Sequence, residues 1–158
     1  MGDPVERYFS EFPGYAGGPR PGEDWRRLGS FNQLADEKHW SRPVREQEFL
    51  RLKDAQIEVV EIEINSLSTI NDYQALCRQV GIPEVPESAR QAYTLLSGVF
   101  VNLVDLIQLR KTGGQGSVTN YGSSGALKDY SETERKVCPV PQKRSKVLRK
   151  LLREFDQE

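Results

Sequence analysis

The sequence predicts an all-α protein, a compact bundle of about six helices around a central apolar helix at about residues 87–111. One observation is that apolar residues recur at helical spacing in most segments between the glycines and prolines. Another is the uncharged stretch 91–104, which has 14 residues. A membrane span needs about 20 mostly apolar residues, so this stretch is expected to be a buried helix.

The first 22 residues are predicted to form an aromatic, proline- and glycine-rich arm, followed by a single helical domain over 23–158. VERYFSEF is long enough for one or two helical turns, and the prolines and glycines of PGYAGGPRPG favour a loop or an extended arm after it. Tyr8, Phe9, Phe12 and Tyr15 are candidates for fixing the arm to the domain, and the first three for contacting a partner.

Residues 23–65 are predicted to contain two helices. Trp25, Leu28 and Phe31 begin an apolar face with helical spacing over 23–40, and Ser41 and Pro43 fit the start of the next helix. The segment IEVVEIEI at 57–64 is rich in β-branched residues, which favours a strand. Polar residues at steps of three and four across 47–65 favour a helix instead, which is our prediction, with a short strand as the alternative.

The clearest helical pattern follows, in STINDYQALCRQVGIP. Ser68 or Thr69 is a suitable N-cap, Gly81 ends the helix, and Pro83 forbids its continuation. Pro86 then precedes the predicted central helix.

The C-terminal third begins with a loop at 112–125 that holds five glycines. A short helix is predicted from SGALKDYSETE, and VCPVP is expected to be extended because residues before proline avoid the helical region. A last helix is predicted from Pro141 to Phe155, and its apolar face consists of Val147, Leu148, Leu151, Leu152 and Phe155.

Three stretches resemble a family of small helical proteins of filamentous fungi: YQALCRQVGIPEVPESARQA, VNLVDLIQLRKTG and LKDYSETERKVCPVPQKRSKVLRKLLREF. The element FPGY and the segment from Phe31 to Trp40 fit the same pattern, so the resemblance covers about Tyr8 to Phe155. The resemblance implies a helical fold, including a helix over 44–65, and makes VNLVDLI a structural signature. It implies no activity, cofactor or catalytic residue.

Asn102 and Asp105 interrupt the apolar run GVFVNLVDLIQLRK. Buried polar groups are usually hydrogen-bonded, so both are expected to be structural, fastening a neighbouring loop or pairing with an arginine. A partner-binding role is one alternative, and an acid of raised pKa in a pocket is the other.

Charge is unevenly distributed along the chain. Residues 135–153 hold eight Lys/Arg and no acid, which leaves 14 basic against 23 acidic residues elsewhere. The basic side chains predicted to contact a partner are Lys143, Arg144, Lys146, Arg149, Lys150 and Arg153. The alternatives are that these charges offset an acidic body or bind nucleic acid.

Other chemistry has weaker support in the sequence. His39, Cys77 and Cys138 come from distant segments without the spacing of a zinc site, so neither a metal nor a cofactor is expected. The loop GGQGSVTNYGSSG lacks the Gly-Lys-Ser/Thr ending of a phosphate-binding loop. Glu58 and Glu61 fit a solvated helix face better than an acid/base pair.

These observations predict a non-enzymatic protein of the nucleus or cytoplasm that binds another macromolecule. A charged N-terminus without an apolar run argues against secretion, and two cysteines make no disulfide framework. The first hypothesis is a protein-binding adaptor that uses the basic C-terminal helix and the aromatic arm. The alternative is nucleic-acid binding through 135–153, and neither a membrane nor a small-molecule substrate is expected.

Overall fold

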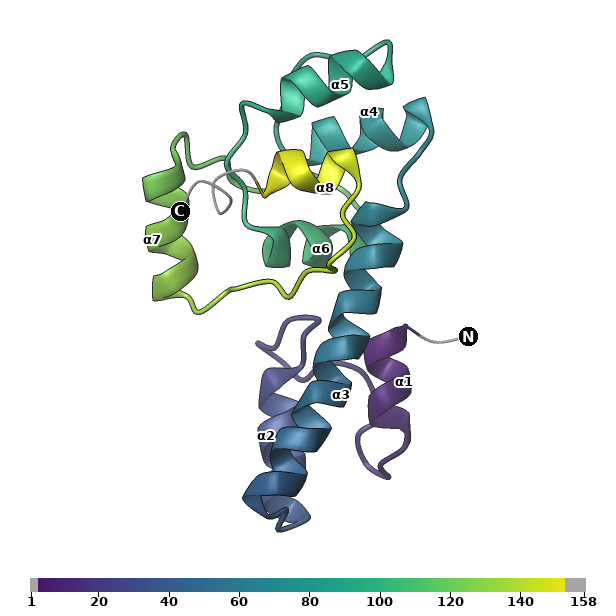
Figure 1. Cartoon of the computed structure of the whole chain (residues 1–158), viewed down its shortest axis with the longest axis vertical. Coiled ribbons are helices and arrows are strands. Elements are labelled where there is room, and N and C mark those ends of the chain that lie inside the picture. Colours follow the sequence, from purple (N-terminus) through teal and green to yellow (C-terminus); the bar gives the residue numbers. More distant parts are fainter. Residues whose placement is uncertain (1–2, 153–158) are drawn as a thin grey trace. The chain divides into compact units, whose positions relative to one another are not determined.

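The computed structural model describes residues 3–152, and in that range every regular element is helical (Figure 1). The all-α prediction is therefore confirmed. The elements in chain order are α1 (Pro4–Ser10), α2 (Leu28–Glu37), α3 (Arg42–Val60), the π-helix η1 (Glu61–Asn65), α4 (Ile70–Gln79), α5 (Ala89–Leu96), α6 (Leu103–Lys111), α7 (Ser124–Thr133) and α8 (Lys146–Leu151).

The chain divides into two compact units. Unit 1 comprises residues 1–60 with 139–141, and unit 2 comprises residues 61–138 with 142–158. The sequence predicted an arm over 1–22 and one domain over 23–158, so its boundary at residue 22 differs from the observed boundary after Val60. The structure groups the N-terminal 22 residues with α2 and α3 because their apolar side chains are part of the core of unit 1.

Helix α1 brings the N-terminal aromatic residues into the core of unit 1. Asp3 caps it, with Oδ1 accepting hydrogen bonds from the backbone N–H of Val5 at 2.8 Å and of Glu6 at 3.2 Å. Tyr8 and Phe9 are buried, and α1 lies beside α3 within this unit (Figure 1). The helical turns predicted in VERYFSEF are confirmed, and the segment 13–22 that follows has no regular helix, as predicted.

Helices α2 and α3 supply the rest of the core of unit 1. Trp25, Phe31 and Leu34 are buried, but the helix predicted over 23–40 begins only at Leu28. The reason is the backbone of Arg27, which is left-handed with φ 57° and ψ 41° and cannot continue a right-handed turn toward the N-terminus. Ser41 does precede α3 as predicted, and its Oγ accepts from Val44 N at 3.4 Å.

The segment 57–64 is helical, so the strand alternative is wrong. It forms the end of α3 and most of η1. Val59, Val60 and Ile64 are buried and Glu58 is exposed, while Ile62 in the same segment is 54% exposed.

Helix α4 in unit 2 follows its sequence signals closely. Thr69 is the N-cap, and its side chain accepts from Asp72 N while the Asp72 carboxylate accepts from Thr69 N, which is a capping box. Leu76 and Cys77 are fully buried, and Gly81 has a φ of +86° directly after the helix ends.

The predicted central helix over 87–111 is two helices, α5 and α6, and this part of the prediction is wrong. Asn102 caps α6, with Oδ1 accepting from Asp105 N at 3.1 Å. The backbone between the two helices is also paired elsewhere, since Phe100 N donates to Asn120 Oδ1 and Phe100 O accepts from Tyr121 N. The Asn102 cap and the hydrogen bonds to the loop at Asn120 and Tyr121 therefore satisfy backbone groups that a continuous helix would have paired.

The apolar character of this region was predicted correctly. Leu96, Val101, Val104, Leu106 and Ile107 are each at most 1% exposed in the core of unit 2. Helix α6 packs against η1, while α5 packs against α4 and α8.

The glycine-rich loop is fastened to unit 2 through α4. Arg78 Nη2 donates to Gly114 O at 3.0 Å, and Val118 N donates to Gln79 O at 2.8 Å. Helix α7 follows where predicted, with Leu127 buried, but α8 begins at Lys146 rather than at Pro141. Ser145 caps α8, so the helix starts five residues after the predicted position, and its predicted end at Phe155 lies outside the described residues.

Candidate functional site

Helix α8 has one apolar side and one basic side. Val147, Leu148 and Leu151 are each at most 1% exposed, and Leu152 is also buried. Each fully buried leucine or valine contributes about 1.5–3 kcal/mol to folding. Burial of these four side chains therefore fixes which side of α8 faces solvent.

Asn65 of η1 holds the segment that leads into α8. Its Nδ2 donates to Lys143 O at 2.8 Å and to Glu61 Oε2 at 2.9 Å, and its Oδ1 accepts from Ser145 N. The Ser145 side chain then accepts from Leu148 N at 3.2 Å. Because both residues before the helix are anchored, the basic side chains start from a defined backbone.

Several cations lie on the exposed side of α8 and just before the helix. Lys143, Arg144, Lys146 and Arg149 are exposed, and Lys150 is half-buried. Within residues 3–152, the ion pairs do not include Lys143, Lys146, Arg149 or Lys150. Arg144 makes a further interaction of its own, and Arg153 lies outside the described residues.

Helix α5 extends this basic surface with two residues that sequence reasoning did not select. Lys146 Nζ lies 5.1 Å from the centroid of the Tyr93 ring, a cation–π contact. Arg90 is exposed and stands one helical turn before Tyr93. Helix α5 lies beside α8 (Figure 1), and because the two are about 50 residues apart in the chain, the sequence alone did not indicate the contact of Lys146 with Tyr93.

We call this group the α8 basic surface: Lys143, Lys146, Arg149 and Lys150 with Arg90 and Tyr93. It combines clustered positive charge with one half-buried aromatic ring. Such a surface can bind carboxylates or phosphates through charge-assisted hydrogen bonds.

The aromatic residues of the predicted arm have structural partners in unit 1. The Phe9 ring has no exposed surface and lies 4.2 Å below the Arg27 guanidinium. The Tyr8 hydroxyl donates to Glu48 Oε1 at 2.9 Å. Burial raises the pKa of Tyr8, and this hydrogen bond to the Glu48 carboxylate raises it further. Phe12 is half-buried, and its ring centroid lies 5.8 Å from that of Trp40. Tyr8 and Phe9 therefore contribute to the core of unit 1 and offer almost no surface to a partner.

Asn102 and Asp105 form a polar cluster with α7 and the segment after it. Asn102 Nδ2 donates to Ser131 Oγ at 3.0 Å and to Lys136 O at 2.8 Å. Asp105 accepts from the Tyr130 hydroxyl at 2.6 Å and from Lys136 Nζ at 2.9 Å. The two residues thus fasten α7 to α6 rather than the glycine-rich loop, and the cationic partner is a lysine rather than an arginine.

This cluster shifts the ionisation of both side chains that bind Asp105. Burial and the hydrogen bond to Asp105 raise the pKa of Tyr130 to about 12. The hydrogen bonds to Asp105 and Tyr130 raise the pKa of Lys136. At neutral pH the tyrosine therefore donates as a neutral hydroxyl, beside a charged ammonium group.

The cysteines and the histidine do not come together. Cys77 is buried in the core of unit 2, where burial raises the pKa of its thiol, and Cys138 is half-buried. His39 is exposed after α2, in unit 1. Over residues 3–152 no group of three His, Cys, Asp or Glu side chains is placed to hold a metal ion.

Over the same range, none of the helices combines the length and the apolar composition that a membrane crossing requires. Neither a family model, nor a curated protein, nor a solved structure matches this chain. The site is therefore interpreted from its own geometry and charge.

Proposed function

We propose that the protein acts by binding rather than by catalysis, and that the α8 basic surface recognises an acidic segment of a protein partner. One observation carries the proposal: four cations lie within 143–150 without an ion pair in the described part of the chain, and one of them, Lys146, lies over the Tyr93 ring. Arg7, Arg51 and Arg110, in contrast, each lie within 3.4 Å of a carboxylate oxygen.

Charge balance favours a protein partner over nucleic acid. Unit 2 contains 13 Lys/Arg against 12 Asp/Glu, and the isoelectric point of the whole chain is about 6.0. Domains that bind nucleic acid usually carry a large net positive charge, because phosphate contacts supply most of their affinity. A local cluster in a nearly neutral unit suits a short run of Glu or Asp side chains better.

Binding to a defined acidic probe tests the proposal. A fluorescent oligoglutamate peptide is expected to raise its anisotropy with the wild-type protein, and added salt is expected to weaken the binding. The double substitution Lys146→Glu and Lys150→Glu is expected to abolish it. Lys38→Glu with Lys53→Glu is the matched control, because it makes the same change of charge in exposed positions of unit 1.

Two results would contradict the proposal. Equal loss of binding in both double variants would mean that net charge alone attracts the peptide. Tighter binding of a DNA duplex than of the peptide, lost in the α8 variant, would favour the nucleic-acid alternative.

A fluorescent fusion would test the further expectation of a nuclear or cytoplasmic location, which rests on the basic run QKRSKVLRK.

A further inference from the structure

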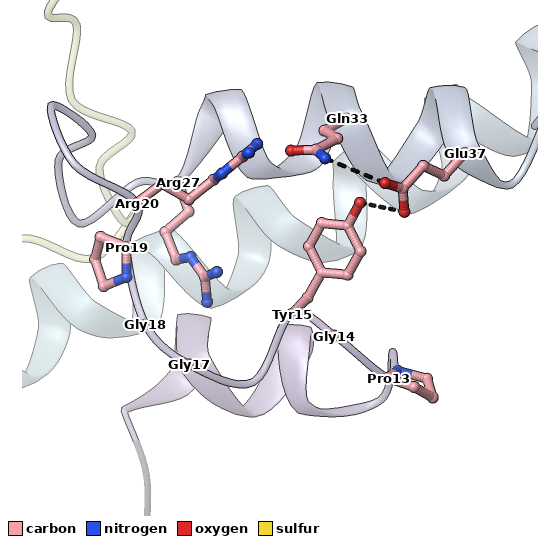
Figure 2. A pocket seen from close by; sticks show the side chains of 10 residues that line it. All are labelled: Pro13, Gly14, Tyr15, Gly17, Gly18, Pro19, Arg20, Arg27, Gln33 and Glu37. Carbon is pink, nitrogen blue, oxygen red and sulfur yellow. Dashed lines mark hydrogen bonds between the residues drawn. The ribbon is translucent and has the colours of Figure 1, made fainter.

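Unit 1 contains a hollow between its N-terminal loop and α2. Its volume is about 410 Å³, within the range of small-ligand sites. The loop over 13–20 forms one wall, and Gly14 and Gly18 bend it with φ of +91° and +83°. Figure 2 shows two arginine side chains at one end of the hollow and Tyr15 and Glu37 at the other.

Arg27 borders the hollow with hydrogen-bonding capacity that the protein does not use. Its side chain is 2% exposed, and neither Nε nor Nη1 has a hydrogen-bond partner. Nη2 makes only a long contact, 3.4 Å, with Ser30 Oγ. Buried N–H groups of a charged side chain are rarely left unpaired, because leaving water without a replacement partner is costly.

The nearest carboxylate does not fill this need. Glu23 Oε1 lies 3.9 Å from Arg27 Nε, beyond hydrogen-bond distance. Its oxygens already accept from Ser30 Oγ at 2.7 Å, from Ser30 N and from Arg20 N at 3.1 Å. Burial consequently lowers the pKa of Arg27 although Glu23 and Glu6 oppose the shift.

Arg27 is also held firmly in place. Its guanidinium lies over the Phe9 ring, and its backbone adopts the left-handed region that a residue with a Cβ rarely occupies. The fold therefore keeps a positively charged donor at one end of the hollow, where an anionic group would complete its hydrogen bonds.

The opposite end of the hollow has a hydrogen-bond acceptor without a donor. Gln33 Nε2 donates to Glu37 Oε1 at 3.1 Å, which fixes the orientation of the amide and leaves Gln33 Oε1 without a donor. Tyr15 donates to Glu37 Oε2 at 2.6 Å. These two hydrogen bonds, Tyr15 first, lower the pKa of Glu37, so this end combines a carboxylate with an unpaired carbonyl oxygen.

We propose that this hollow binds a small zwitterion of the size of a dipeptide. Its carboxylate pairs with Arg27, and its ammonium group donates to Gln33 Oε1 beside Glu37. Arg27 lies directly before α2 and Gln33 lies within it, and the volume of about 410 Å³ leaves room for a molecule of this size between them. The site is separate from the α8 basic surface and was not foreseen in the sequence, which led us to expect no small-molecule substrate.

Titration of the full chain with three probes tests the assignment. Glycylglycine has both charges, N-acetylglycine has only the carboxylate, and glycinamide has only the ammonium group. Glycylglycine is expected to give saturable NMR shifts at Arg27 Nε–H and at the Gln33 side-chain amide. The other two probes are expected to bind at least about fivefold more weakly, since each loses one charge-assisted contact.

Variants connect the binding to the named residues. Arg27→Met is expected to weaken glycylglycine binding at least about tenfold, and Gln33→Met about fivefold. Arg51→Met is the matched control, because Arg51 pairs with Glu11 and Glu48 in unit 1 and does not border the hollow. Circular dichroism establishes whether each variant is folded. If Arg27→Met does not fold, Gln33→Met still tests the site, because Gln33 is half-buried on α2.

Three outcomes would overturn the proposal. The first is an absence of saturable shifts in the wild-type protein up to millimolar glycylglycine. The second is unchanged affinity in both Arg27→Met and Gln33→Met. The third is N-acetylglycine binding as tightly as glycylglycine, which would remove the ammonium end of the assignment.

Discussion

At the scale of single residues, Asn102 performs two structural tasks with one side chain. Its amide oxygen caps α6, while its amide nitrogen donates to Ser131 and to the backbone of Lys136. The sequence indicated a structural role for a polar residue within an apolar run. It did not indicate the cap, because Asn and Asp three residues apart were interpreted as interior positions of one long helix.

The substitution Asn102→Asp separates these two tasks. The carboxylate keeps an acceptor for Asp105 N but loses both donors and faces the Lys136 carbonyl. We expect the free energy of unfolding, measured with urea, to fall by about 1–3 kcal/mol. Ser123→Asp at the N-cap of α7 is the control and should change it by less than about 0.5 kcal/mol. Unchanged stability of Asn102→Asp would show that the donors are dispensable.

At the scale of elements, the sequence predicted the existence of helices better than their ends. Thr69 and Gly81 delimit α4 as expected because both signals act within one turn of the backbone. The separation of α5 from α6 depends on Asn120 and Tyr121, about 20 residues away, which no local pattern contains. The start of α8 likewise depends on Asn65, 78 residues before Lys143.

Gly98 lies between α5 and α6 and provides a test of what separates them. A Cβ there would meet only Leu95 O at 3.8 Å, and the backbone does not require glycine. Gly98→Ala is therefore expected to leave the helix content by circular dichroism unchanged and to raise stability by at most about 1 kcal/mol.

Gly81→Ala is the matched comparison for this prediction. Its φ of +86° is unfavourable for alanine, so this variant should lose about 1 kcal/mol. A clear gain in helix content in Gly98→Ala would mean that the glycine, rather than the Asn102 cap, interrupts the helix.

At the scale of the whole molecule, the sequence predicted the helical class and the uneven charge but not the division into two units. The position of the core depends on which apolar faces meet, and the aromatic residues of the first 22 positions were expected to fix an arm to a single domain rather than to form the core of a separate unit. The hollow beside Arg27 was also beyond prediction, since its two unpaired groups are identified only by the contacts they lack.

Both units contain tyrosines that make the chain sensitive to alkali. Burial and the hydrogen bond to Glu37 raise the pKa of Tyr15 in unit 1 to about 12, and burial and the hydrogen bond to Asp105 raise that of Tyr130 in unit 2 to about 12. An unfolded tyrosine ionises near 10, so the folded state retains protons that the unfolded chain releases. The contribution of these tyrosines to the free energy of unfolding is therefore fully present below about pH 10, and it is lost as the pH rises toward 12.

The raised pKa of Lys136 acts in the same direction, because the charged pair with Asp105 is lost as the lysine deprotonates. We expect urea unfolding to show a fall in stability between pH 10 and 12. Tyr130→Phe, which has no hydroxyl to ionise, should flatten this fall relative to its own value at neutral pH. An equally steep fall in the variant would show that Tyr130 does not contribute to it.

The chain has two tryptophans, and both belong to unit 1, where Trp25 is 2% exposed and Trp40 lies against Phe12 and Phe31. Intrinsic indole emission consequently observes only that unit, whereas far-ultraviolet ellipticity observes the helices of both. A melting experiment that records the two signals together can thus follow one part of the polypeptide against the total without any attached dye.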